Sequence, residues 1–170
     1  MSKGAIALIV VESEILFIDA ARHTFEGCNY ELPRGGAEDE ESDIDCAIRE
    51  AHEEAGVNIK KSDCSVIGHV RPDTGVLTTE IPVVIACHTL SEGEVPTSMF
   101  SEGESRSVHL FSAQRISKAI REGKITCGIS LAALMLFQEH IRFNGQDEKN
   151  LSRHKNIKHG RKNSFSSNKI

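Results

Sequence analysis

The feature that most constrains the fold is a stretch over residues 35–57, where a glycine turn leads into a helix. Ser42 or Asp43 can cap the start of this helix, and Gly56 marks its end. Apolar residues recur at helical spacing and form one stripe: Ile44, Ala47, Ile48, Ala51 and Ala55. The helix must therefore pack one side against a hydrophobic core.

Three glutamates of the same helix lie next to the apolar stripe. At 100° per residue, Glu50, Glu53 and Glu54 span an arc of about 100°. Like charges this close raise one another's pKa unless a cation neutralises them, and oxygen ligands at this density suit Mg²⁺ or Mn²⁺. Arg49 could hold a further carboxylate, such as Glu41, in place. The competing interpretation is a solvated acidic helix face.

The rest of the chain predicts strands with interspersed helices. Short apolar or β-branched runs predict strands over residues 4–11, 14–19, 30–32, 64–71, 78–90 and 107–111. Helical patterns cover residues 112–122 and 130–143, and an acidic segment with Gly and Pro, residues 91–105, predicts a long loop. This order favours an α/β fold, a sandwich in which helices cover a mixed β-sheet.

Composition narrows the class of protein. No apolar run approaches the length needed to span a bilayer, and Met1 is followed almost at once by a predicted strand rather than by a signal peptide. The five cysteines are widely spaced without any CxxC pair, which indicates neither a zinc site nor a disulfide framework. We therefore expect a cytoplasmic protein with reduced thiols and no membrane partner.

The charge is distributed unevenly. Residues 1–150 carry 14 Lys and Arg against 25 Asp and Glu, a formal charge of −11, whereas residues 151–170 carry 6 Lys and Arg and no acid. We predict one catalytic domain over residues 1–144 and a basic, disordered tail over residues 145–170. The tail could contact nucleic acid phosphates, although a solubilising extension is the interpretation we favour.

The spacing of the glycines and charged residues resembles the Nudix box. The fixed positions are Gly35, Glu41, Arg49, Glu50, Glu53, Glu54 and Gly56. Seven such matches arise by chance at roughly 10⁻⁸ per starting point. The resemblance implies a Nudix-type α/β/α sandwich and hydrolysis of a nucleoside diphosphate linked to another group. It also implies a cofactor, Mg²⁺ or Mn²⁺, with more than one ion per site.

The resemblance assigns roles position by position. Glu50, Glu54 and the backbone carbonyl beside Gly35 would bind metal, and Glu53 would be a catalytic carboxylate that binds the metal or supports its ligands. Glu41 and Arg49 would orient the helix that carries these ligands. Metals held there would offset pyrophosphate charge and activate a water.

Features outside the box resemble the ADP-ribose or ADP-sugar pyrophosphatase branch of the family. Pro72, with Arg71 before it, lies 16 residues beyond Gly56, as a proline does in that branch. Glu102 and Glu104 form a Glu-x-Glu pattern; by position Glu102 is the general base and Glu104 a metal ligand, although the two roles could be exchanged.

Other features leave alternatives open. Arg34 precedes the box glycine and could bind substrate phosphate, and a basic residue at this position also occurs in other Nudix branches. These branches act on dinucleoside polyphosphates, NADH or capped RNA. A ligand sensor without catalysis ranks last, because every glutamate of the box is present. A homodimer is compatible with the resemblance.

Overall fold

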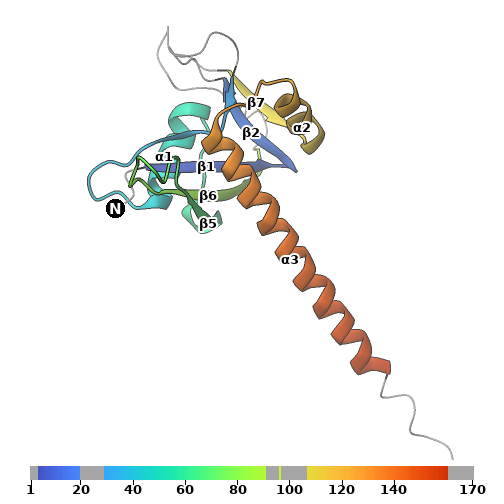
Figure 1. Ribbon diagram of the computed structural model, residues 1–170. Helices are drawn as coiled ribbons and strands as arrows, with labels where there is room; N and C mark the ends of the chain where they lie inside the picture. Colours follow the sequence, from blue (N-terminus) through green and yellow to red (C-terminus); the bar gives the residue numbers. More distant parts are fainter. Residues whose placement is uncertain (1–3, 20–28, 91–95, 97–106, 161–170) are drawn as a thin grey trace, which may run out of the picture. The chain divides into compact units, whose positions relative to one another are not determined.

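The computed structural model describes residues 4–19, 29–90, 96 and 107–160, with residues 145–160 described through their backbone alone. The elements of this part of the chain are β1 (Gly4–Val11), β2 (Glu14–Asp19), β3 (Tyr30–Glu31), β4 (Arg34–Gly36), α1 (Asp43–Ala55), the 3₁₀ helix η1 (Lys61–Asp63), β5 (Cys64–Val70), β6 (Ile81–His88), β7 (Val108–Phe111), α2 (Ala113–Arg121) and α3 (Gly128–Gly160). The predicted α/β fold with a mixed sheet is confirmed (Figure 1).

The strands form one mixed sheet. Its main path runs β3-β2-β1-β6-β5, while β4 also pairs with β1 and β7 with β2. The pair β1 and β6 is parallel, with Leu8 opposite Ile85, and the other pairs are antiparallel. β1 pairs with three other strands and therefore lies inside the sheet, and its side chains are buried on both faces, as the wholly apolar sequence GAIALIVV requires.

Helix α1 covers one face of the sheet. Its alanines Ala47, Ala51 and Ala55 join a core cluster with alternate residues of β1, such as Ala7 and Ile9. The Ser42 side chain accepts a hydrogen bond from the Asp45 N–H at the start of α1, and Gly56 ends the helix in the left-handed conformation, at φ 67°. The predicted helix and both of its boundaries are confirmed.

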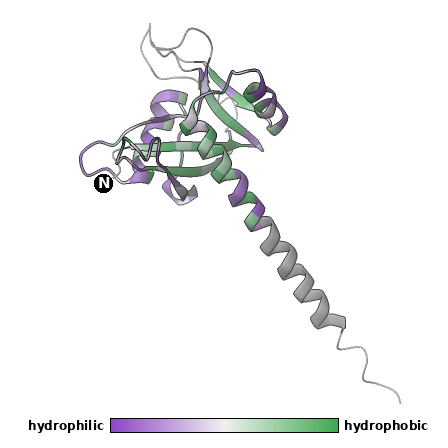
Figure 2. Ribbon diagram, in the orientation of Figure 1, coloured by the Kyte–Doolittle hydropathy of each residue, from purple (hydrophilic) through white to green (hydrophobic). Residues whose placement is uncertain are grey.

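Helix α2 follows β7 directly and packs next to it. The rings of Phe17 and Phe111 lie 5.1 Å apart, and Ile116 and Ala119 are the buried residues of α2. Figure 2 shows hydrophobic colouring along the central strands and hydrophilic colouring on much of α1 and α2. Amphipathic helices and a two-sided apolar sheet are what a layered α/β domain requires.

Two elements differ from the sequence-based expectation. Residues 34–36, predicted as a loop, form β4 because Ile6 of β1 offers a pairing partner to Arg34. Helix α3 continues to Gly160, whereas we expected a helix ending at Phe143 and a disordered tail. Residues 145–158 are polar but include several types with good helix propensity, namely Lys, Arg, Gln, Glu and Leu. Their polar composition is therefore compatible with a helix. The expectation for residues 161–170 lies outside the described part.

The chain divides into two compact units, Met1–Leu136 and Phe137–Ile170. The sheet, α1, α2 and the beginning of α3 belong to the first unit. Within the described residues, no helix is long and apolar enough to cross a membrane.

Hydrogen bonds tie β3 and the residues beside it to the segment between α2 and α3 and to the first turn of α3. Tyr30 N–H donates to the Lys124 carbonyl at 2.8 Å, and Leu32 N–H donates to the hydroxyl of Ser130 at 3.1 Å. The Asn29 side-chain oxygen accepts from the N–H and hydroxyl of Thr126. Since Asn29 and Ser130 are buried, these bonds satisfy groups that water does not reach.

Replacing Ser130 by alanine should destabilise the domain by about 1–3 kcal/mol, because the buried N–H of Leu32 loses its acceptor. Urea unfolding of full-length Ser130→Ala and wild-type protein measures the difference. Ser117→Ala is the control, since Ser117 is exposed on α2 and accepts only from the Arg121 side chain among the described contacts. Equal stability of Ser130→Ala and Ser117→Ala would contradict the prediction.

Candidate active site

Helix α1 places two buried carboxylates one turn apart. Glu50 is 7% exposed and Glu54 is 4% exposed, although ionised carboxylates are rarely buried without a partner. Glu53 lies between them in sequence and is half-exposed, with 46% of its side chain accessible. The i, i+4 spacing of Glu50 and Glu54 directs both toward the same side of the helix.

Strand β4 brings backbone atoms against these carboxylates. A Cβ atom added to Gly35 would collide with the carboxyl group of Glu50, and one added to Gly4 would collide with the Gly35 carbonyl oxygen. The N–H of Arg34 donates to Oε2 of Glu54 at 3.0 Å. The glycines therefore allow a close approach that side chains would block, as the Nudix-box pattern implied.

Arg49 connects the carboxylates. Its Nε and Nη2 donate to the two oxygens of Glu41 at 3.0 and 3.1 Å, the contact that the sequence predicted. Its Nη1 donates to Glu50 at 2.8 Å and to Glu53 at 3.0 Å, and its Nη2 also reaches the Gly36 carbonyl at 2.6 Å. One guanidinium therefore holds three carboxylates and the backbone of β4, which its planar set of five donors permits.

These contacts and burial shift the pKa values of the site residues, some upward and some downward. Hydrogen bonds from Arg49 lower the pKa of Glu41, while the carboxylates raise the pKa of Arg49. Burial raises the pKa of Glu50, and the charges of Glu53 and Glu41 add to this effect. Burial also raises the pKa of the nearby Cys46 thiol to about 11, so this thiol stays protonated and unreactive near neutral pH.

The donor set is suited to a hard divalent cation. Glu41, Glu50, Glu53 and Glu54 carry four formal negative charges, and Arg49 is the cation that pairs with three of them. The described residues contain no preformed group of three or more His, Cys, Asp or Glu side chains placed to hold a metal. Glu50 instead accepts a hydrogen bond from Arg49, and Glu54 accepts one from the Arg34 N–H. A bound cation would offset the energetic cost of burying these charged oxygens and would reduce their mutual repulsion.

A third buried carboxylate, Glu31 on β3, was not among the residues that the sequence predicted for the site. It is 3% exposed, accepts from the Asn29 amide at 2.9 Å and pairs with Nη2 of Arg34 at 3.0 Å. Nε of Arg34 is buried without a hydrogen-bond partner. The alternation of Tyr30, Glu31 and Leu32 gave no sign that the polar residue faces inward, because the strand is too short to show a period.

The remaining predicted site residues lie elsewhere. Arg71 and Pro72 are exposed in the segment after β5, where Arg71 pairs with Glu80 at 3.5 Å. Among the described contacts, no hydrogen bond or ion pair joins either of them to α1. Glu102 and Glu104 fall outside the described residues. The structure brings together five of the predicted site residues by direct contacts: Gly35, Glu41, Arg49, Glu50 and Glu53. Glu54 is linked to this group by the hydrogen bond that it accepts from the Arg34 N–H.

Comparison with known proteins now identifies the class. The profile of the NUDIX domain matches residues 1–127, so the chain belongs to the Nudix hydrolase family. As a family, these hydrolases depend on divalent metals. No curated protein sequence matches the chain.

Two solved structures share the fold. One, described as an ADP compounds hydrolase, has a TM-score of 0.67 and 16% identity, with 84% of this chain and 74% of that chain covered. Another, a MutT/nudix family protein from Enterococcus faecalis, has a TM-score of 0.51 and 19% identity, with 65% of this chain and 44% of that one covered. At these identities the similarity shows the fold alone.

Replacing Arg49 by glutamine should destabilise the protein by about 2–3 kcal/mol, because three partly buried carboxylates lose their shared cation. Urea unfolding without added divalent metal measures the loss. Lys61→Gln is the matched control, since Lys61 pairs with Asp45 on the surface and should show no measurable change. Wild-type stability of Arg49→Gln would show that this guanidinium does not hold the site together.

Proposed function

We propose that this Nudix hydrolase cleaves the pyrophosphate bond of a nucleoside diphosphate linked to a sugar, with ADP-ribose as the leading substrate and two monophosphates as products. The observation that carries the proposal is the buried pair Glu50 and Glu54, of which Glu50 packs against Gly35 and Glu54 accepts from the Arg34 N–H. The fold shared with an ADP compounds hydrolase supports the choice of ADP-sugar substrates.

Residues of α1 and β4 would hold the metal. Glu50, Glu54 and the Gly35 carbonyl are the proposed ligands of Mg²⁺ or Mn²⁺, which when bound offsets phosphate charge and activates a water. Arg49 keeps Glu50 and Glu53 oriented through the bonds that its Nη1 donates. Arg49 also donates to Glu41 and to the Gly36 carbonyl, and through the latter bond it joins α1 to β4.

Other proposed roles concern the base and the substrate. Glu102 would act as general base and Glu104 as a further metal ligand, both outside the described residues. Arg34 would bind substrate phosphate with the guanidinium N–H groups that Glu31 does not use, since about a quarter of its side chain is exposed. Arg71 and Pro72 would contact the substrate from the exposed segment after β5.

We also propose that the enzyme is cytoplasmic. Its support is that Cys46, Cys64, Cys87 and Cys127, the cysteines of the described residues, are all free thiols. Assembly as a homodimer is the arrangement compatible with the proposed branch of the family.

Glu54→Gln should reduce hydrolysis of ADP-ribose at least 100-fold, because the amide keeps the size of the carboxyl group but loses the charge that binds metal. The measurement is AMP release with Mg²⁺, alongside Mn²⁺ affinity of the same variant. Glutamine can still accept from the Arg34 N–H, so the fold should be retained. Glu139→Gln is the control, because Glu139 is exposed and pairs with Arg142. Unchanged activity of Glu54→Gln would refute the assigned mechanism.

A substrate panel should show the highest kcat/KM for ADP-ribose or another nucleoside diphosphate sugar. The panel includes a dinucleoside polyphosphate, NADH and capped RNA, the substrates of the competing hypothesis. That hypothesis draws support from the six Lys and Arg of residues 151–170, which could attract RNA phosphates. If capped RNA is preferred and truncation after residue 150 abolishes that preference, the ADP-sugar assignment is wrong.

A further inference from the structure

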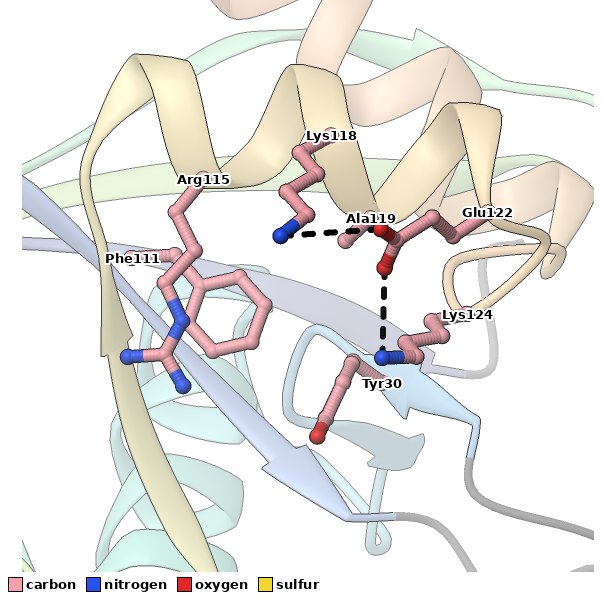
Figure 3. Close-up of a pocket in the computed structure, with 7 residues that line it drawn as sticks. All are labelled: Tyr30, Phe111, Arg115, Lys118, Ala119, Glu122 and Lys124. Carbon is pink, nitrogen blue, oxygen red and sulfur yellow. Dashed lines mark ion pairs between the residues drawn. The ribbon is translucent and has the colours of Figure 1, made fainter.

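A small pocket lies between α2, β3 and β7, away from the carboxylates of α1. Its volume is about 140 Å³, and Figure 3 shows the residues that line it: Tyr30, Phe111, Arg115, Lys118, Ala119, Glu122 and Lys124. Val108 and Leu110 of β7 pack against the core that contains α1, whereas Phe111, the residue after Leu110, lines the pocket. Since side chains alternate along a strand, the pocket and α1 lie on opposite faces of the sheet.

Aromatic rings form one wall of the pocket. The ring of Phe111 lies 4.8 Å from that of Tyr30, and the guanidinium of Arg115 lies over Phe111 at 4.1 Å from the ring centroid. Arg115 Nη1 also donates to the Leu110 carbonyl at 3.3 Å. Stacking and hydrogen bonding hold the cation in place without neutralising it, and no carboxylate of the described residues pairs with it.

The pocket carries an excess of positive charge. Three cations line it against one carboxylate, a formal charge of +2. Glu122 lies 3.7 Å from Lys118 and 3.2 Å from Lys124, and both ammonium groups hold the pKa of this carboxyl below its usual value. The ionised Glu122 thus offsets part of the charge of the two lysines, while Arg115 lies on the other side of the pocket, as Figure 3 shows.

We propose that this pocket binds a phosphate group, either inorganic phosphate or a small phosphomonoester. The volume of about 140 Å³ is room enough for a tetrahedral oxyanion. A planar guanidinium and two ammonium groups form charge-assisted hydrogen bonds with a phosphate dianion, and these are stronger than hydrogen bonds from neutral donors. The site is separate from the proposed metal site, so it does not depend on the proposed reaction.

Binding can be measured by calorimetric titration of the full-length protein with inorganic phosphate, without divalent metal and at low salt. Arg115→Gln should weaken phosphate binding at least tenfold, and Lys124→Gln should weaken it several-fold. Arg115→Lys should retain part of the affinity. Arg142→Gln is the control, since Arg142 lies in the second compact unit and pairs with Glu139.

Glu122→Gln gives a test of opposite sign. Removing this negative charge should strengthen phosphate binding several-fold, whereas a purely structural role of Glu122 would weaken it. Repeating the titrations with ribose 5-phosphate separates the two sources: tighter binding identifies a phosphomonoester, and weaker binding identifies free phosphate. Absence of saturable binding of both probes, or equal affinities of wild type and a folded Arg115→Gln, would overturn the proposal.

Discussion

The five hydrogen bonds of Arg49 to carboxylates and to the β4 backbone are the interaction on which the rest of the site depends. Without a cation, Glu41, Glu50 and Glu53 would repel one another, and the side chains of Glu41 and Glu50 are largely shielded from water. The guanidinium converts this repulsion into a set of directed bonds. It also fixes α1 to β4, the strand that contains Gly35 and Gly36, so the geometry of the site and the packing of the helix depend on the same contacts.

The site also requires that the backbone of β4 lie close to α1 and to β1. Gly35 leaves room for the Glu50 carboxyl group, and Gly4 leaves room for the Gly35 carbonyl, so two strands and a helix meet without intervening side chains. The apolar stripe of α1 can then be built from alanines, which keep the helix close to β1. Ala51, smaller than the aliphatic residue usual at this position of the Nudix box, is fully buried and fits this close packing.

The sheet separates two kinds of charge. Its α1 face carries the carboxylates that would bind cations, and its α2 face carries the cationic pocket beside Phe111. An apolar layer between them, with Leu8, Phe17 and Val83 fully buried, limits direct contact between the two sites. β3 lies at the border, because Tyr30 lines the pocket while Glu31 pairs with Arg34 near α1.

Periodicity and spacing in the chain were sufficient for α1, its caps, most strand positions and the meeting of Arg49 with Glu41, because these depend on residues close in sequence. They were insufficient for β4, which exists only because β1 pairs with it, and for the inward orientation of Glu31, because the strand β3 is too short to show a period. The cationic pocket needs Tyr30 and Lys124, whose proximity arises from strand and helix packing. Local patterns thus determine which groups a segment presents, and long-range pairing decides which of those groups meet, since contact across the fold leaves no period in the sequence.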